Sequence, residues 1–328
     1  MSHSFDEQAP AKRQRLEAET SITRSSTWHL DGSVVLQAES TQFRVHWSVL
    51  SLNSTFFQEL QGLPQPLDEQ KVEGCPVVEL QDSAIDVQRL LDVLYSPLKF
   101  GESKLRLSLI GSIIRLGRKY DFKDLLAAAV DRLTYENPQT LGEYEKLKKN
   151  DSGAYATTKY ILYKGMLLDV IILAHENGLF TLLPCAYLRL FLYTPLETMI
   201  EGIDGPYGRV ELSVEQQKIC VAAKRKIMEV QWRDPDVWSW FSSGFGAQDC
   251  TSRTNSCALK KTLLFRTFVV GDVSFIPFGA VPKQLQASMC EACIRRHKEV
   301  MAAGRKKMWD ELPTFFGLPP WSELKNDL

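Results

Sequence analysis

The chain has no apolar run long enough to cross a membrane, and no apolar segment at its N-terminus. A spanning helix needs about 20 predominantly apolar residues. The longest candidate, Met166–Ala174, contains Asp169 and is followed at once by His175 and two further polar residues. The first ten residues, MSHSFDEQAP, also lack the apolar centre of a secretory signal. We therefore expect no membrane association and no secretion.

The sequence also lacks an excess of charge of either sign and the short motifs of common enzymes. It has 39 Lys and Arg against 40 Asp and Glu, a net charge of −1, so no overall field would attract nucleic acid directly. No glycine-rich loop precedes Lys-Ser/Thr, and no G-x-S-x-G occurs. We predict that the protein is not an enzyme. Seven cysteines without a signal peptide predict reduced thiols, in the nucleus or the cytoplasm.

Apolar side chains that alternate with other residues, and residues that can cap helices, are concentrated near the N-terminus. Apolar side chains at every second position predict antiparallel strands over Val34–Ala38 and Gln42–His46. Ser48 and Ser54 are placed to cap two helices, and Pro76–Leu80 is predicted as a third strand. The predicted core of this region is Val34, Leu36, Phe43, Val45, Leu50, Phe57, Leu80, Leu91 and Leu94.

A helix is predicted after the third strand, with its apolar residues on one face. Asp82 is placed to cap this helix, which should end at Tyr95-Ser96-Pro97. Apolar residues continue at helical spacing between residues 109 and 133. Together these segments predict a small sheet packed against helices.

This order of elements resembles a BTB/POZ domain. The resemblance is carried by an Asp, an F-x-x-H, a Val-Leu pair, a Ser and a Phe, which are here Asp31, Phe43, His46, Val49, Leu50, Ser54 and Phe57. Trp47 departs from the pattern, because the family usually has Arg or Lys there. The resemblance implies an α+β fold in which a small sheet clasped by helices precedes a mostly α-helical C-terminal domain.

The resemblance implies a protein-interaction module that associates with itself or with another BTB protein. Residues expected to take part are Trp28, Asp31, His46, Phe56, Leu67 and Glu69. Leu67-Asp68-Glu69 has the hydrophobic-x-Glu form found in substrate adaptors of cullin-type ubiquitin ligases, so a cullin scaffold is an expected partner. The alternative is a nuclear regulator of transcription or chromatin that acts through protein partners.

Three regions are predicted along the chain. Residues 1–25 form a disordered arm, residues 26–135 a BTB-like domain with a trailing helix pair, and residues 136–328 a mainly helical C-terminal domain. In the last region we expect a strand-like segment over 262–270 and one long helix over 282–312. More loosely, the whole chain resembles fungal, basidiomycete-type BTB proteins with a helical C-terminal half.

Two short clusters in these regions have open interpretations. Lys12–Arg15 is either a nuclear-import signal or ordinary solvated charge. Five of the seven tryptophans lie late in the chain, among them Trp309 and Trp321. They form either a partner-binding surface or the anchors of the C-terminal core.

The cysteines suggest a metal centre. Cys290 and Cys293 form a C-x₂-C pair, and Cys250 and Cys257 precede them in a polar stretch. Four thiols can hold a tetrahedral structural zinc ion, with His297 as a substitute ligand, if the sulfur atoms lie within about 4 Å of one another. Buried cysteines without a metal are the alternative. A redox role is disfavoured because the predicted long helix places the pair in mid-helix.

Overall fold

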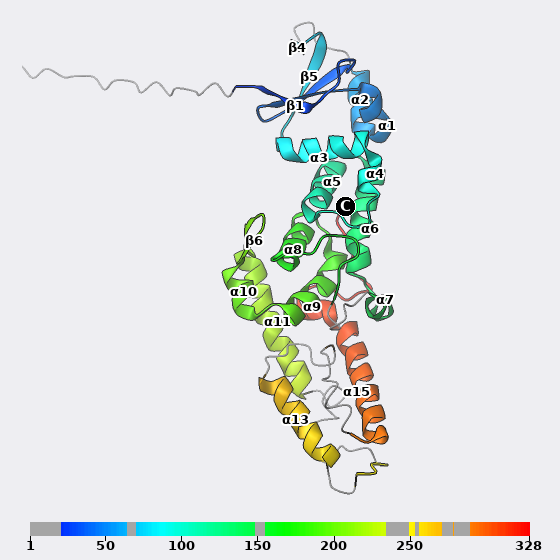
Figure 1. The fold of residues 1–328 in the computed structure, drawn as a ribbon, viewed down its shortest axis with the longest axis vertical. Helices are drawn as coiled ribbons and strands as arrows, with labels where there is room; N and C mark the ends of the chain where they lie inside the picture. The colour runs from blue at the N-terminus through cyan, green and yellow to red at the C-terminus, as the bar shows by residue number, and fades with distance from the viewer. Residues whose placement is uncertain are drawn as a thin grey trace, which may run out of the picture.

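The computed structural model describes residues 21–63, 70–147, 155–233, 249–252, 256–270, 278 and 289–328. The molecule is elongated, with a small sheet at one end and helices α13 (Ser256–Val270) and α15 (Glu291–Asp310) at the other (Figure 1). Within these residues, no helix combines the length and the apolar composition needed to span a bilayer.

Five strands form the sheet, in the order β1-β3-β2-β5-β4. Their bounds are Thr23–Trp28 for β1, Val34–Ala38 for β2, Thr41–Val45 for β3, Lys71–Val72 for β4 and Cys75–Leu80 for β5. The predicted hairpin is confirmed, because β2 and β3 pair antiparallel with Val35 opposite Arg44. β5 pairs parallel with β2, which brings the third predicted strand into the same sheet.

The outer strand β1 was not predicted. It pairs parallel with β3, with Thr23 opposite Thr41. The strand begins at Thr23, so the disordered arm predicted for residues 1–25 is wrong at its C-terminal end. Its sequence, TRSSTW, has no apolar alternation, because it lies at an edge of the sheet where most of its side chains meet solvent. Residues 1–20, including Lys12–Arg15, lie outside the described residues.

Three helices cover the sheet: α1 (Trp47–Asn53), α2 (Thr55–Gly62) and α3 (Ala84–Tyr95). Every predicted core residue is buried except Leu94, which is partly buried against the core. The predicted cap of α2 is also confirmed. The Ser54 hydroxyl accepts from the Phe57 N–H at 3.1 Å and donates to the Tyr120 carbonyl at 2.5 Å.

Two predicted caps are wrong by one or two residues. α1 begins before Ser48, and its first N–H, from Trp47, donates to the Ser33 hydroxyl at 3.0 Å. α3 is capped by Ser83, whose hydroxyl accepts from the Asp86 N–H at 3.3 Å. The neighbouring carboxylate of Asp82 points elsewhere and pairs with a lysine of a later helix, which only the tertiary structure reveals.

The remaining elements are almost all helical. They are α4 (Pro97–Phe100), α5 (Leu107–Lys119), α6 (Lys123–Glu136), α7 (Leu141–Lys146), α8 (Met166–Glu176), η1 (Phe180–Leu182), α9 (Leu183–Tyr193), α10 (Leu196–Glu201), β6 (Ile203–Gly205), β7 (Gly208–Val210), α11 (Val214–Arg233) and α16 (Leu312–Phe315). One hydrophobic cluster extends from the sheet into the C-terminal helices, so packing is continuous across residues 135 and 136. A mostly helical C-terminal region after a small sheet agrees with the predicted fold class.

Two predictions about the C-terminal region need correction. The segment 262–270 is helical and belongs to α13, because a short apolar run does not distinguish a strand from a helix. The single helix predicted over 282–312 is shorter: α15 begins at Glu291, and Cys290 is its N-cap residue. Residues 281–288 lie outside the described part of the chain. The C-x₂-C pair therefore lies at a helix N-terminus instead of in mid-helix.

Candidate functional site

Exposed apolar side chains gather on the two short helices beside the sheet. Leu52, near the end of α1, is 85% exposed, and Phe56, in the first turn of α2, is 40% exposed. The opposite sides of these helices bury Leu50 and Phe57 in the core. Figure 1 shows α1 and α2 together along one side of the domain. We call Leu52 and Phe56, with the partly buried Val49, the α1–α2 face.

Phe56 belongs partly to the core. Its ring centre lies 5.2 Å from that of Phe57, edge to face, and 5.1 Å from that of Tyr120. A substitution of Phe56 would therefore disturb folding as well as any contact with a partner. Leu52 has no such role, which makes it the better residue to test this surface.

The predicted interaction residues Asp31 and His46 pair with each other. Nε2 of His46 lies 3.2 Å from the Asp31 carboxylate, and Nδ1 lies 2.9 Å from the Tyr95 hydroxyl, which also accepts from the His46 backbone N–H. These contacts are all satisfied when the hydroxyl donates to Nδ1 and the ring proton faces Asp31. A hydrogen bond from its own backbone and one from His46 lower the pKa of Asp31.

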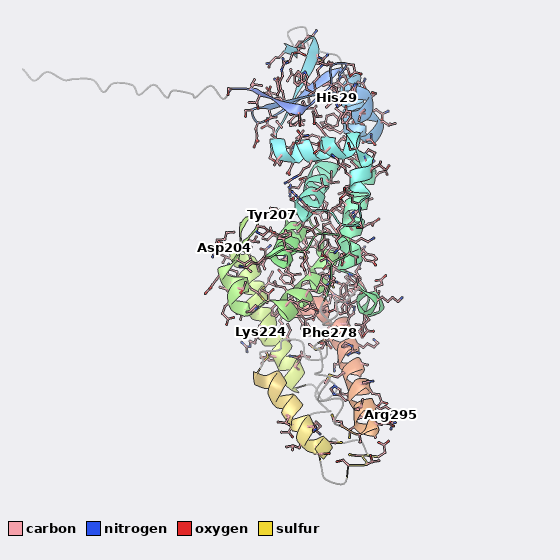
Figure 2. The ribbon with its side chains drawn as sticks, in the orientation of Figure 1. His29, Asp204, Tyr207, Lys224, Phe278 and Arg295 are labelled. Atoms are coloured by element: carbon pink, nitrogen blue, oxygen red, sulfur yellow. The ribbon has the colours of Figure 1, made fainter. Side chains whose placement is uncertain are left out.

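His29 completes this cluster, and sequence patterns did not single it out. Its ring stacks on Tyr95, with the ring centres 4.3 Å apart. In Figure 2, His29 lies where the sheet meets the α1 and α2 helices. The cluster therefore holds the end of β1 against α3, and His46, predicted as an interaction residue, makes structural hydrogen bonds at a strand-to-helix junction.

Trp28 lies at the end of β1 and is partly buried. The guanidinium of Arg24 lies 4.5 Å from the centre of its ring and also pairs with Glu73 at 2.6 Å. Glu73 pairs with Arg44 of β3 as well, at 2.9 Å. The predicted interaction residues Leu67 and Glu69 lie outside the described residues.

These features agree with a comparison with known families. The family model of the BTB/POZ domain matches residues 29–137. This segment is a BTB/POZ domain. It includes the predicted hairpin, α1 to α3 and the trailing pair α5 and α6, and BTB domains are protein-interaction domains. No curated protein matches the chain, so the fungal resemblance stays a prediction.

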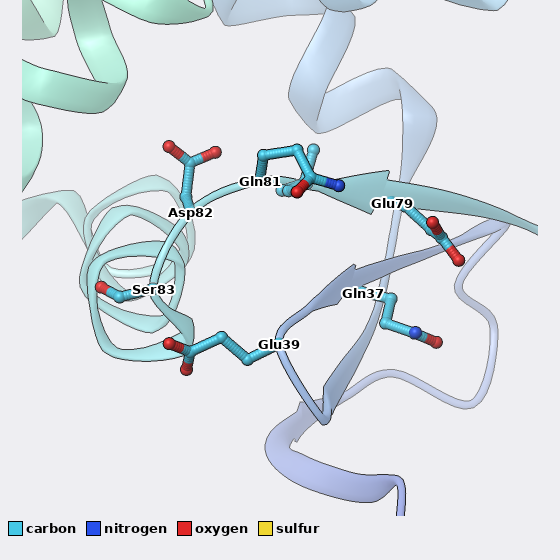
Figure 3. Close-up of a pocket in the computed structure, with 7 residues that line it drawn as sticks. Gln37, Glu39, Glu79, Gln81, Asp82 and Ser83 are labelled. Atoms are coloured by element: carbon cyan, nitrogen blue, oxygen red, sulfur yellow. The ribbon is translucent and has the colours of Figure 1, made fainter. Parts of the chain in front are cut away.

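A polar depression lies at the end of β2 and β5 in the BTB domain. It has a volume of about 480 Å³ and is lined by Gln37, Glu39, Glu79, Leu80, Gln81, Asp82 and Ser83 (Figure 3). Several of its acidic groups already make structural contacts. Glu39 accepts from the first N–H of α3, at Ala84, and Asp82 accepts from Lys119 and from the Tyr120 hydroxyl. The carboxylates of Glu39 and Asp82 therefore hold helices in place, and they are not arranged as a pair for acid–base catalysis.

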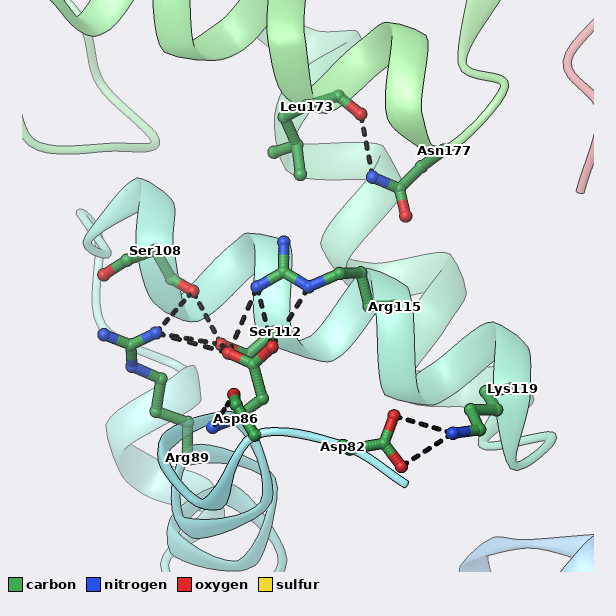
Figure 4. Close-up of polar contacts among 10 residues, drawn as sticks. Asp82, Asp86, Arg89, Ser108, Ser112, Arg115, Lys119, Leu173 and Asn177 are labelled. Carbon is green, nitrogen blue, oxygen red and sulfur yellow. Dashed lines mark hydrogen bonds and ion pairs between the residues drawn. The ribbon is translucent and has the colours of Figure 1, made fainter. Parts of the chain in front are cut away.

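A carboxylate network joins the sheet domain to its trailing helices. Asp86 of α3 accepts from Arg115 through both oxygens, at 2.9 Å for Oδ2 and 3.1 Å for Oδ1, and from the Ser112 hydroxyl at 2.6 Å (Figure 4). Lys119 pairs with Asp82 at 2.9 Å one turn further along α5. Paired Arg–carboxylate contacts fix direction as well as distance, so they set how α5 sits on α3.

A second pocket, of about 360 Å³, lies where α3 and α5 meet the C-terminal region near Tyr207, which Figure 2 labels. Its lining includes Arg115, Tyr163 and Asp169. Tyr163 donates to Asp169 at 2.6 Å, and burial raises the pKa of Asp169. Arg115 is engaged with Asp86, so both Arg115 and Asp169 already have partners within the protein.

A buried network of charged and polar side chains at the end of α6 was not predicted from the sequence. Glu136 is fully buried, and its Oε1 accepts from the backbone N–H groups of Thr158 and Lys159 at 2.6 and 2.7 Å. Its other oxygen accepts from the Tyr155 hydroxyl. The guanidinium of Arg189, a residue that is only 1% exposed, stacks on the Tyr155 ring, 3.5 Å from the ring centre. This network fastens the BTB domain to the C-terminal region.

The four predicted metal ligands converge. The sulfur atoms of Cys250, Cys257, Cys290 and Cys293 all lie within 4.8 Å of one another. Those of Cys250 and Cys290 are 3.8 Å apart. His297, the predicted substitute ligand, is not part of this group among the described residues. Hydrogen bonds from the backbone N–H groups of Cys293 and Thr251 lower the pKa of the Cys290 thiol to about 6.

Proposed function

We propose that the protein is an interaction module that self-associates through the α1–α2 face of its BTB domain. The observation that carries the proposal is the 85% exposure of Leu52, next to a phenylalanine that is 40% exposed, on a domain of a protein-interaction family. Single exposed leucines are common on protein surfaces. A leucine and a phenylalanine on adjoining helical turns provide the apolar centre that a stable interface requires.

The small net charge of the chain and the open edge of the sheet favour association. The net charge of −1 gives little long-range repulsion between two copies. β1 is an outer strand, so one side of its backbone has no neighbouring strand in the described sheet. An open strand edge can pair with another chain. A specific interface buries about 1,600 Å² in total, so the contact should extend beyond the α1–α2 face itself.

We expect Leu52→Glu to yield a folded monomer. Two carboxylates would be buried without partners in a symmetric contact, and the desolvation cost should weaken self-association by at least about 100-fold. Leu98→Glu is the matched control, since Leu98 is 90% exposed on α4, outside the α1–α2 face. Light scattering should show the control at wild-type mass. If Leu52→Glu keeps the same mass as the control, this face is not the interface.

The resemblance extends the proposal to a substrate adaptor of a cullin-type ubiquitin ligase, with a nuclear transcription or chromatin role as the alternative. The first rests on Leu67-Asp68-Glu69 and the second on Lys12–Arg15. Affinity purification of the full chain followed by mass spectrometry separates them. A cullin scaffold supports the adaptor role, and recovery of chromatin proteins without a cullin supports the alternative.

A further inference from the structure

Three segments bring four thiols together at the end of the molecule opposite the sheet. Cys250 lies in the segment 249–252, Cys257 in the first turn of α13, and Cys290 and Cys293 at the start of α15. Residues up to 43 positions apart thus share one small volume, with every sulfur within 4.8 Å of the others. Buried cysteines that serve only as core residues have no reason to meet in a group of four.

We propose that Cys250, Cys257, Cys290 and Cys293 bind one structural zinc ion. Zn–S bonds of about 2.3 Å in a tetrahedron place the sulfur atoms about 3.8 Å apart. The Cys250 and Cys290 sulfurs are already at 3.8 Å, and since all the sulfurs lie within 4.8 Å of one another, no pair needs to close by more than about 1 Å. Thiolate ligands in this number select zinc over magnesium or calcium, which prefer oxygen.

The local backbone prepares this geometry. Cys290 is the N-cap residue of α15 and Cys293 belongs to its first turn, so the C-x₂-C spacing places both side chains at the same end of the helix. The backbone N–H of Cys290 donates to the Cys257 sulfur at 3.3 Å. N–H groups that donate to ligand sulfurs orient the thiolates and offset their charge.

The surroundings also hold the segment that carries Cys250 next to α15. Asp249, next to Cys250, pairs with Arg295 of α15 at 2.5 Å, which fixes the 249–252 segment against the helix. Figure 2 shows Arg295 at this end of the molecule. Four protein ligands leave no open coordination position, so the ion would link α13 to α15 without performing chemistry.

A disulfide is the competing use of these thiols. It would require the sulfurs of Cys250 and Cys290 to move from 3.8 Å to about 2.05 Å, and it would leave Cys257 and Cys293 without a function. Zinc uses all four. The two states can be distinguished, because only the zinc-bound state contains a metal and only the disulfide is cleaved by a reductant.

The test is metal analysis of the full-length chain purified under reducing conditions. We expect one zinc per chain, displacement by a chelator, and, after cobalt replacement, the visible absorption of tetrahedral Co²⁺ with thiolate ligands. Cys250→Ser should reduce bound zinc at least about tenfold; because Cys250 is exposed, this variant should remain folded. Cys75→Ser is the control, since its hydroxyl can still donate to the Gly32 carbonyl that the Cys75 thiol contacts, and it should keep one zinc.

Circular dichroism should confirm that both variants are folded. The proposal is overturned if the reduced wild-type chain binds neither zinc nor cobalt above background. It is equally overturned if Cys250→Ser and Cys290→Ser each retain one tightly bound zinc, or if the metal-free protein shows a Cys250–Cys290 disulfide and binds no zinc after reduction.

Discussion

Glu136→Ala is expected to lower the free energy of unfolding by about 3–5 kcal/mol, because it removes one member of a buried charged network. The alanine would leave two backbone N–H groups, of Thr158 and Lys159, without their present acceptor. It would also remove the acceptor of the Tyr155 hydroxyl, and Tyr155 is the ring on which the buried Arg189 guanidinium stacks. Donors that lose their acceptor in a largely buried network are costly, and the deletion also removes a fully buried side chain.

Chemical unfolding followed by circular dichroism measures this loss. Glu136→Gln keeps the shape and one acceptor oxygen, so we expect an intermediate loss. Glu102→Ala is the matched surface control, since Glu102 is exposed in a turn, and it should change stability by less than about 0.5 kcal/mol. A loss below about 1 kcal/mol for Glu136→Ala would mean that the network does not hold the two regions together.

Trp309→Ala should also destabilise the protein by about 3–5 kcal/mol. Trp309 is 3% exposed, and its ring centre lies 5.8 Å from that of Trp321 in a stacked arrangement and 5.1 Å from that of Tyr144. Its indole N–H donates to the Gln139 carbonyl at 3.0 Å. The side chain therefore connects α15 to the segment just before α7, and its removal leaves a large cavity.

Trp321→Ala provides the comparison for this site. Trp321 is only partly buried, and its indole N–H donates to the Trp309 carbonyl, a contact that Trp309→Ala leaves in place. We expect it to cost less than half as much as Trp309→Ala. Thermal unfolding of the two variants and of the double variant gives the coupling between the rings. Equal losses for both single variants would contradict the central position of Trp309.

The hairpin and the sheet core could be predicted because their signals are local. Alternation over Val34–Ala38 and the capping position of Ser54 depend on residues a few positions apart. β1 gave no such signal, since TRSSTW is polar and its pairing partner β3 lies about 17 residues further along the chain. The apolar, β-branched run at the end of α13 gave a misleading signal, because a short apolar run does not distinguish a strand from a helix.

The same contrast between local and long-range signals holds for the candidate sites. Spacing predicted the cysteine group, which the structure brings together, but it did not predict that Cys290 caps a helix. Nothing local marks Glu136, whose partners lie 19 to 23 residues away in an irregular segment. Nothing local marks Arg189 either, because its hydrogen-bond partner, Asn137, is 52 residues away. Buried polar networks are assembled by the tertiary fold, so a single sequence does not reveal them.

The self-association of the BTB domain is tested most directly by the mass of the wild-type chain in solution. Size-exclusion chromatography with light scattering at tens of micromolar should give about twice the 37.3 kDa mass of one chain, falling toward that mass on dilution. A mass of one chain at every concentration up to that range would contradict the proposal.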